Sequence, residues 1–140
     1  MDLADEMGDT RLIAPALAKN VGISVDSETR SRMAFLAARH FFQEGGHGTA
    51  LGILGMGDKD AAAFPRAEAL RGVVLAQQGQ ANDALAPLLT AQAMADKTED
   101  PARFRDVMAL NLGRSYYTAG NFAQAITYFA GFSLAGLRRQ

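Results

Sequence analysis

The sequence predicts an all-α protein built from three pairs of antiparallel helices, and three observations support this fold class. Apolar residues recur at helical spacing through most of the chain. Glycines interrupt these stretches at Gly45, Gly79 and Gly120, and the first two interruptions are 34 residues apart. The residues around the three glycines follow one pattern, which indicates an internal repeat. Repeated helix pairs are expected to stack, because no single pair can bury its apolar face alone.

The repeated pattern places small residues at fixed positions around each glycine. A small residue stands seven positions before the glycine, and an alanine stands five positions after it. We expect the glycine to adopt the left-handed conformation that closes a helix, and the small residues to lie where two helices approach closely. The positions that carry this structural repeat are Ala38, Gly45, Ala50, Gly72, Gly79, Ala84, Gly113, Gly120 and Ala125.

The individual elements follow from these positions and from residues that favour helix starts. Residues 1–26 are predicted to form an N-terminal segment and linker, in which residues 10–19 form a short helix. Asp26 or Ser27 can cap the next helix with a side-chain oxygen. Pro65 and Pro101 suit the first turn of a helix. The predicted helices of the repeats are 27–44, 47–56, 65–78, 81–95, 101–119 and 122–135.

The repeat domain is predicted to span residues 27–140, with repeats at about 31–64, 65–98 and 106–139. Its first repeat departs most from the pattern, since the second helix of that repeat contains Gly48, Gly52 and Gly55. Each glycine within a helix costs about 1 kcal/mol relative to alanine. Either neighbouring backbone packs closely on these glycines, or this helix frays.

The third repeat resembles a tetratricopeptide repeat (TPR) over residues 111–129, which read NLGRSYYTAGNFAQAITYF. The second repeat is similar to the same family, and the first is a degenerate copy. The step from Gly79 to Gly120 is 41 residues and resembles the longer-helix TPR class of kinesin light chains. The extra residues, around 96–101, are expected to lengthen the helices on either side. The resemblance implies a TPR-like α-solenoid and a non-catalytic role in protein–protein interaction.

The resemblance also implies a binding surface, because the first helix of each TPR lines a concave groove. The first helices of this chain hold most of its arginines, whereas the second helices carry almost no charge. Guanidinium groups bind carboxylates and aromatic rings bind apolar side chains, so such a groove suits an acidic or extended peptide. The alternative is that the arginines pair with Glu28, Glu68 and Asp106 of the chain itself. The predicted partner-binding residues are Arg32, Phe35, Arg39, Phe42, Arg66, Val73, Asn111, Arg114 and Tyr117.

A structural or oligomerisation module is the second hypothesis for the function. The outer face formed by the second helices is expected to be uncharged, and the last helix contains Tyr128, Phe132, Leu134 and Leu137. End repeats normally need a polar outer face. We therefore expect either self-association into a homo-oligomer through the C-terminal repeat or a further repeat beyond it.

The composition argues against several classes of partner. A net charge of −1 gives no overall attraction to nucleic acid or to an anionic membrane surface. No apolar run reaches the 18 or so residues of a membrane span, so a soluble chain is expected. The first residues are acidic and show no signal peptide, and the localisation stays open.

Candidate catalytic and metal-ligating groups are few. His40, Glu44 and His47 have the spacing of metal ligands on one helix face, but Gly45 and Gly46 interrupt that helix, and structural roles are predicted. The glycine-rich segments lack the Gly-Lys-Ser/Thr ending of a phosphate-binding loop. The chain has no cysteine nucleophile and no Ser/His/Asp arrangement. We therefore expect no enzymatic activity, no cofactor and no bound metal.

Overall fold

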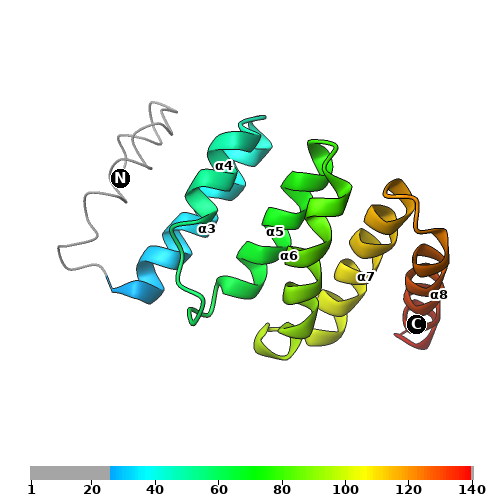
Figure 1. Ribbon diagram of the computed structural model, residues 1–140. Helices are drawn as coiled ribbons and strands as arrows, with labels where there is room; N and C mark the ends of the chain where they lie inside the picture. The colour runs from blue at the N-terminus through cyan, green and yellow to red at the C-terminus, as the bar shows by residue number, and fades with distance from the viewer. Residues whose placement is uncertain (1–25, 140) are drawn as a thin grey trace. The chain divides into compact units, whose positions relative to one another are not determined.

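The computed structural model describes the backbone of residues 26–139 and the side chains of residues 26–131 (Figure 1). This part of the chain is all-α and contains no strand, as the sequence predicts. The short helix expected at residues 10–19 lies outside the described residues. The helices are α3 (Ser27–Gln43), α4 (His47–Leu54), α5 (Phe64–Gln77), α6 (Ala81–Ala93), α7 (Pro101–Thr118) and α8 (Phe122–Arg139), with a 3-10 helix η3 (Ala95–Lys97) between α6 and α7.

The three glycines that define the repeat all close a helix in the left-handed conformation. The φ angles of Gly45, Gly79 and Gly120 are 88°, 82° and 92°, a region that residues with a Cβ atom rarely adopt. In each case the amide of the next residue donates a hydrogen bond to the carbonyl five positions back. The three bonds are Gly46 to Phe41 at 2.7 Å, Gln80 to Leu75 at 2.9 Å and Asn121 to Tyr116 at 2.8 Å. Identical helix-ending motifs therefore recur at the predicted register.

The chain divides into two compact units, one ending at Ala67 and the other beginning at Glu68. In the N-terminal unit, Asp26 caps the start of α3, and its carboxylate accepts a hydrogen bond of 2.7 Å from the Thr29 amide. Helix α4 packs against α3. Ala38 and Ala50 are fully buried at the positions where the repeat pattern places small residues.

Polar contacts fasten the loop between α4 and α5 to the first turns of α3. The Ser27 hydroxyl donates to Asp58 Oδ2 at 2.6 Å, and the Asp58 amide donates to Ser31 Oγ at 2.8 Å. The Glu28 carboxylate accepts from the Ala62 amide at 3.0 Å. The Ser27 hydroxyl and the Asp60 amide both bind the Asp58 carboxylate, which lowers its pKa from the ordinary value of 3.8. This loop is therefore held to the first turns of α3.

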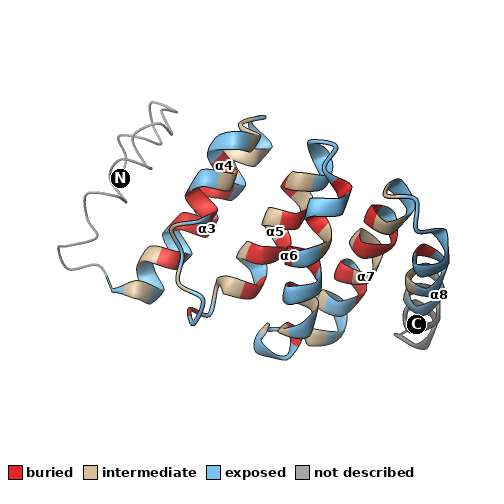
Figure 2. Ribbon diagram, in the orientation of Figure 1, coloured by how far each residue is buried: buried red, intermediate tan, exposed pale blue. Residues whose placement is uncertain are grey.

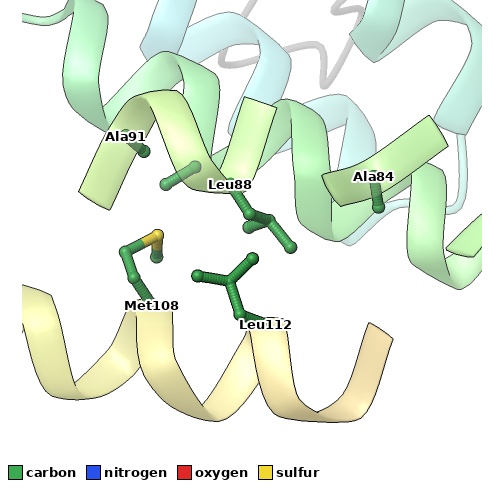
Figure 3. Close-up of a cluster of buried hydrophobic side chains, with 6 residues drawn as sticks. Ala84, Leu88, Ala91, Met108 and Leu112 are labelled. Carbon is green, nitrogen blue, oxygen red and sulfur yellow. The ribbon is translucent and has the colours of Figure 1, made fainter. Parts of the chain in front are cut away.

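In the C-terminal unit, α7 packs against both α6 and α8. Ala69, Ala84, Leu88, Ala91, Met108 and Leu112 form a buried apolar cluster. Figure 3 shows Leu88 of α6 pointing toward Met108 and Leu112 of α7. Leu88 and Leu112 are fully buried, so water is excluded from the contact between these two side chains.

Two glycines allow close helix approaches in this unit, and neither position has room for a side chain. A Cβ atom on Gly72 would lie 2.5 Å from Leu88 Cγ, and one on Gly113 would lie 2.6 Å from Phe129 Cε1. The small residues that the repeat pattern selects in α5 and α7 therefore face large residues in α6 and α8. This is a physical reason for the glycine at each position.

The structure also refines two expectations about helix length. Helix α4 ends at Leu54, before the predicted end at Met56, and nothing packs within 4 Å of where a Cβ of Gly48 or Gly52 would lie. The extra residues of the third repeat lie in η3 and in α7, which has 18 residues against 14 in α5. No helix of the described residues is long and apolar enough to cross a membrane.

Candidate functional site

Two arginines of the N-terminal unit converge on one phenylalanine ring. Phe35 and Arg39 are one turn apart on α3, and Arg66 is the third residue of α5. The guanidinium carbon of Arg66 lies 4.8 Å from the centroid of the Phe35 ring, and that of Arg39 lies 5.8 Å from it. Phe35 is only 7% exposed, whereas both arginines are exposed. We call these three residues the Arg39–Phe35–Arg66 cluster.

Phe35 is the buried member of the cluster. The sequence placed Phe35 among the residues that contact a partner, but its ring is buried beneath the two guanidinium groups. A cation beside an aromatic ring gains about 0.5–1 kcal/mol at an exposed site. The ring therefore stabilises both guanidinium groups beside it, while both arginines remain exposed.

Neither Arg39 nor Arg66 forms an ion pair with any carboxylate whose side chain the structure describes. Elsewhere the chain does pair its arginines: Arg71 donates to Glu68 through two bonds of 3.0 and 2.9 Å, and Arg105 pairs with Asp96. The hydrogen bonds from Arg71 to Glu68 raise the pKa of the Arg71 guanidinium. The alternative that arginines pair with carboxylates of the chain therefore applies to Arg71, whereas neither arginine of the cluster has such a partner among the described side chains.

The other predicted contacts of the N-terminal unit lie on the same helix. Arg32 is exposed one turn before Phe35, and Leu36 beside it is 43% exposed. Phe42 is half-buried, with its ring 5.1 Å from the ring of His47 in an edge-to-face arrangement. The exposed face of α3 thus combines guanidinium groups with apolar surface.

The predicted partner-binding residues of the C-terminal unit differ in side-chain exposure and hydrogen bonding. Arg114 and Tyr117 on α7 are exposed, and Tyr117 is 61% exposed. Val73 on α5 is half-buried. The Asn111 side-chain amide donates a hydrogen bond of 2.9 Å to the Val107 carbonyl, so one of its N–H groups is already bonded within α7. Of the four predicted contacts in this unit, Arg114 and Tyr117 are the ones with exposed side chains.

The histidines expected to have structural roles are in contact with their neighbours. His47 Nδ1 lies 3.1 Å from the Gly45 carbonyl oxygen, and the His40 ring lies 6.1 Å from that of Phe41. Among the described side chains, no group of three histidines or acids is arranged to hold a metal ion.

Sequence reasoning missed the apolar residues at the start of α8. Phe122 is 56% exposed and Ile126 is 67% exposed, and the Phe122 ring lies edge-to-face against Tyr117 at 5.2 Å. Tyr128, expected at the apolar end of the array, instead stacks on Tyr116 at 5.6 Å within the α7–α8 pair. Burial raises the pKa of the Tyr128 phenol. Phe132, Leu134 and Leu137 lie beyond the described side chains.

Comparison of α8 with the equivalent positions of α6 could have identified these residues from the sequence. In the repeat, Ile126 corresponds to Leu85, which packs against the buried apolar cluster around Leu88. Phe122 corresponds to Ala81, which is only 7% exposed. The last helix pair thus exposes large apolar residues at two positions that are covered in the preceding pair.

Comparison of the sequence with models of known protein families gives no match, and comparison with curated proteins gives no significant match. The functional assignment therefore depends on the arrangement of the residues themselves.

Proposed function

We propose that this chain is a non-catalytic, TPR-like interaction module that binds an acidic, extended protein segment through the first helices of its repeats. The observation that carries this proposal is the Arg39–Phe35–Arg66 cluster. It presents two exposed guanidinium groups that are oriented by one buried ring and have no carboxylate partner among the described side chains.

The TPR-like part of the proposal is supported by the backbone and by the packing. Helix ends with left-handed glycines recur at the repeat register, and small residues lie against large ones in the helix contacts. Both features are what a stack of helix pairs requires. An α-solenoid of TPR type is the arrangement we propose for the chain.

The chemistry of the cluster selects the partner. Each guanidinium has several N–H groups in one plane, and this geometry matches the two oxygens of a carboxylate. The two guanidinium carbons lie 4.8 Å and 5.8 Å from the same ring centroid, so they are close to each other. Neighbouring acidic side chains of one peptide can therefore reach both. Leu36 and Met33, which are 43% and 37% exposed on α3, offer apolar surface to residues between the acids.

The experiment is a binding titration with a defined probe. A fluorescein-labelled peptide of alternating glutamate and leucine is added to the full chain, and its anisotropy is measured at low and at high salt. We expect salt-sensitive binding, and we expect the double variant Arg39→Gln/Arg66→Gln to weaken it by about tenfold or more, since one lost charged hydrogen bond contributes about 1.5–3 kcal/mol.

Two controls make the result specific. Arg103→Gln removes one exposed arginine of α7 that lies outside the cluster and should leave the affinity unchanged. A peptide with glutamine in place of glutamate should bind the wild-type chain poorly. Equal affinity of the double variant and the wild type for the acidic peptide would refute the proposed site.

An assembly module is a second candidate function, and the exposed Phe122 and Ile126 favour it. Under this function the chain joins other protein chains through α8, and the arginines of the first helices are incidental. The double arginine variant separates the two functions, because loss of peptide binding with unchanged molecular mass supports the first.

A further inference from the structure

The loop between α4 and α5, residues 55–63, leads directly into the turn of α5 that carries Arg66. Three hydrogen bonds tie this loop to the first turns of α3, the helix that carries Phe35 and Arg39. We call these three bonds the loop clasp. They join the Ser27 hydroxyl to the Asp58 carboxylate at 2.6 Å, the Asp58 amide to Ser31 Oγ at 2.8 Å and the Ala62 amide to the Glu28 carboxylate at 3.0 Å.

Apolar packing contributes little to holding this loop. Most of the loop is exposed or half-buried, as Figure 2 shows, and Ala61 is its buried residue. A cavity lined by residues that include Ser31, Phe35, Asp58 and Phe64 lies where the first turn of α5 faces α3. An unfilled space supplies no van der Waals contacts that would fix the two helices relative to each other. The loop clasp therefore carries much of the connection between α3 and the start of α5.

The chain between the loop clasp and Arg66 is short and constrained. Ala62 precedes Arg66 by four residues, about one helical turn. Between them, the Phe64 amide donates a hydrogen bond of 3.0 Å to the Ala61 carbonyl. Pro65 is fully buried, and its ring fixes the φ angle at the helix start. Holding the Ala62 amide therefore also sets the direction in which Arg66 leaves the backbone.

The two arginines of the cluster differ in their dependence on the loop clasp. Arg39 and Phe35 lie one turn apart on α3, so the helix itself maintains the 5.8 Å between the Arg39 guanidinium carbon and the ring centroid. Arg66, at 4.8 Å from the same centroid, comes from a different helix. Loss of the loop clasp should therefore displace Arg66 and leave Arg39 beside the ring.

We infer that Glu28 and Asp58 are positioning residues for the proposed binding site: they hold the loop to α3 and thereby keep Arg66 beside the Phe35 ring. The inference rests on the proposed binding of an acidic segment by the Arg39–Phe35–Arg66 cluster. It adds two carboxylates that assist the binding of a carboxylate ligand by acting through Arg66.

The sign of the change in affinity separates positioning from charge. The double variant Glu28→Ala/Asp58→Ala removes two negative charges, so electrostatics alone predicts tighter binding of the acidic peptide. Loss of the loop clasp predicts the opposite, a binding weaker by about threefold or more in the anisotropy titration, because Arg66 loses charged hydrogen bonds to the peptide. Asp60→Ala is the matched control, since it removes a carboxylate from the same loop while the Asp60 amide keeps its bond to Asp58. That control should leave the affinity unchanged or raise it, and unchanged or tighter binding by the double variant would overturn the inference.

A conservative replacement and a mutant cycle test the route through Arg66. Glu28→Gln keeps a side-chain oxygen that can accept the Ala62 amide, so it should bind within about twofold of the wild type, whereas Glu28→Ala should bind more weakly than Glu28→Gln. Arg66→Gln should weaken binding in the wild type but change it by less than about twofold in the Glu28→Ala/Asp58→Ala chain. Equal effects of Arg66→Gln in the two backgrounds would contradict the positioning role.

NMR spectroscopy reports the place of Arg66 without any ligand. The ring current of Phe35 shifts the side-chain signals of nearby arginines, and Phe35→Leu supplies the shifts without that ring. In the Glu28→Ala/Asp58→Ala chain, the Arg66 signals should move toward their Phe35→Leu values while those of Arg39 stay in place. Circular dichroism checks that each variant is folded.

The inference and the proposed function fail in different ways. A wild-type chain that does not bind the acidic peptide refutes the proposed function. Arg66 signals that keep their wild-type shifts in the Glu28→Ala/Asp58→Ala chain refute the positioning role, whether or not the peptide binds.

Discussion

Gly72→Ala is the substitution for which the structure makes the strongest statement about stability. In an exposed helix, replacing glycine by alanine normally stabilises a protein by up to about 1 kcal/mol. At Gly72 the new methyl carbon would lie 2.5 Å from Leu88 Cγ and 3.3 Å from the Ala84 carbonyl oxygen. Leu88 is fully buried against Met108 and Leu112, so it cannot move aside without disturbing α7. Overpacking of this kind costs about 1–3 kcal/mol.

The overpacking outweighs the gain in helix propensity, because the clash involves the branch point of Leu88 as well as one of its flexible ends. We expect a net loss of about 1–2 kcal/mol in the free energy of unfolding. Gly52→Ala is the matched control. Its Cβ atom would meet nothing within 4 Å, so the same substitution should stabilise α4 by about 0.5–1 kcal/mol.

Urea unfolding measures both effects. The three tyrosines lie at positions 116, 117 and 128, so their fluorescence reports on the C-terminal unit, while far-UV circular dichroism reports on all helices. Gly72→Ala should lower the tyrosine midpoint by roughly 0.5–1 M urea. Gly52→Ala should leave that signal unchanged or raise its midpoint. A Gly72→Ala midpoint equal to or above that of the wild type would refute the assigned contact with Leu88.

Three further outcomes are expected. Ala84→Leu should destabilise the C-terminal unit by about 1–3 kcal/mol, because Ala84 is fully buried; an unchanged unfolding midpoint would contradict the repeat register. The pKa of Asp58 is lowered in the folded chain, so its ionised carboxylate adds stability above pH 3.8 that is lost as the pH falls through the folded-state value. The stability advantage of the wild type over Asp58→Asn should therefore shrink below pH 3.8. Thermal unfolding of both proteins at neutral and acidic pH measures this difference, and a difference that stays constant would count against the contact with Ser27. Amides between Gly48 and Gly57 should exchange with solvent faster than those around Leu112, since α4 is short and nothing packs on two of its glycines, and strong protection there would exclude fraying.

The helix pairs could be predicted from the sequence because their signals are local. A glycine that closes a helix acts through its own φ angle and through a hydrogen bond to the carbonyl of a residue a few positions back. Asp26 caps α3 through the amide of Thr29, only three residues away. Gly72 and Gly113 could also be identified from spacing alone, because both stand at the same repeat position, where the first helix of a pair packs closely on the second.

The candidate site could be predicted only in part. Arg39 and Arg66 were both selected from the repeat register, but their convergence on Phe35 joins α3 to the start of α5 and is decided by packing. The same packing buries Phe35, which the sequence assigned to partner contact. The pairing of Arg71 with Glu68 within one helix, by contrast, follows from a spacing of three residues.

The sequence by itself determined the all-α class, the order of the helices and the three glycines that close the first helix of each pair. These features depend on backbone conformation and side-chain size within a few residues, so a linear pattern contains them. Only the tertiary structure decided which side chains remain exposed: Tyr128 turns inward onto Tyr116, while Ile126 faces solvent although its counterpart Leu85 is packed. Exposure depends on whether a neighbouring element covers a residue, and that neighbour is far away in the sequence or belongs to another chain.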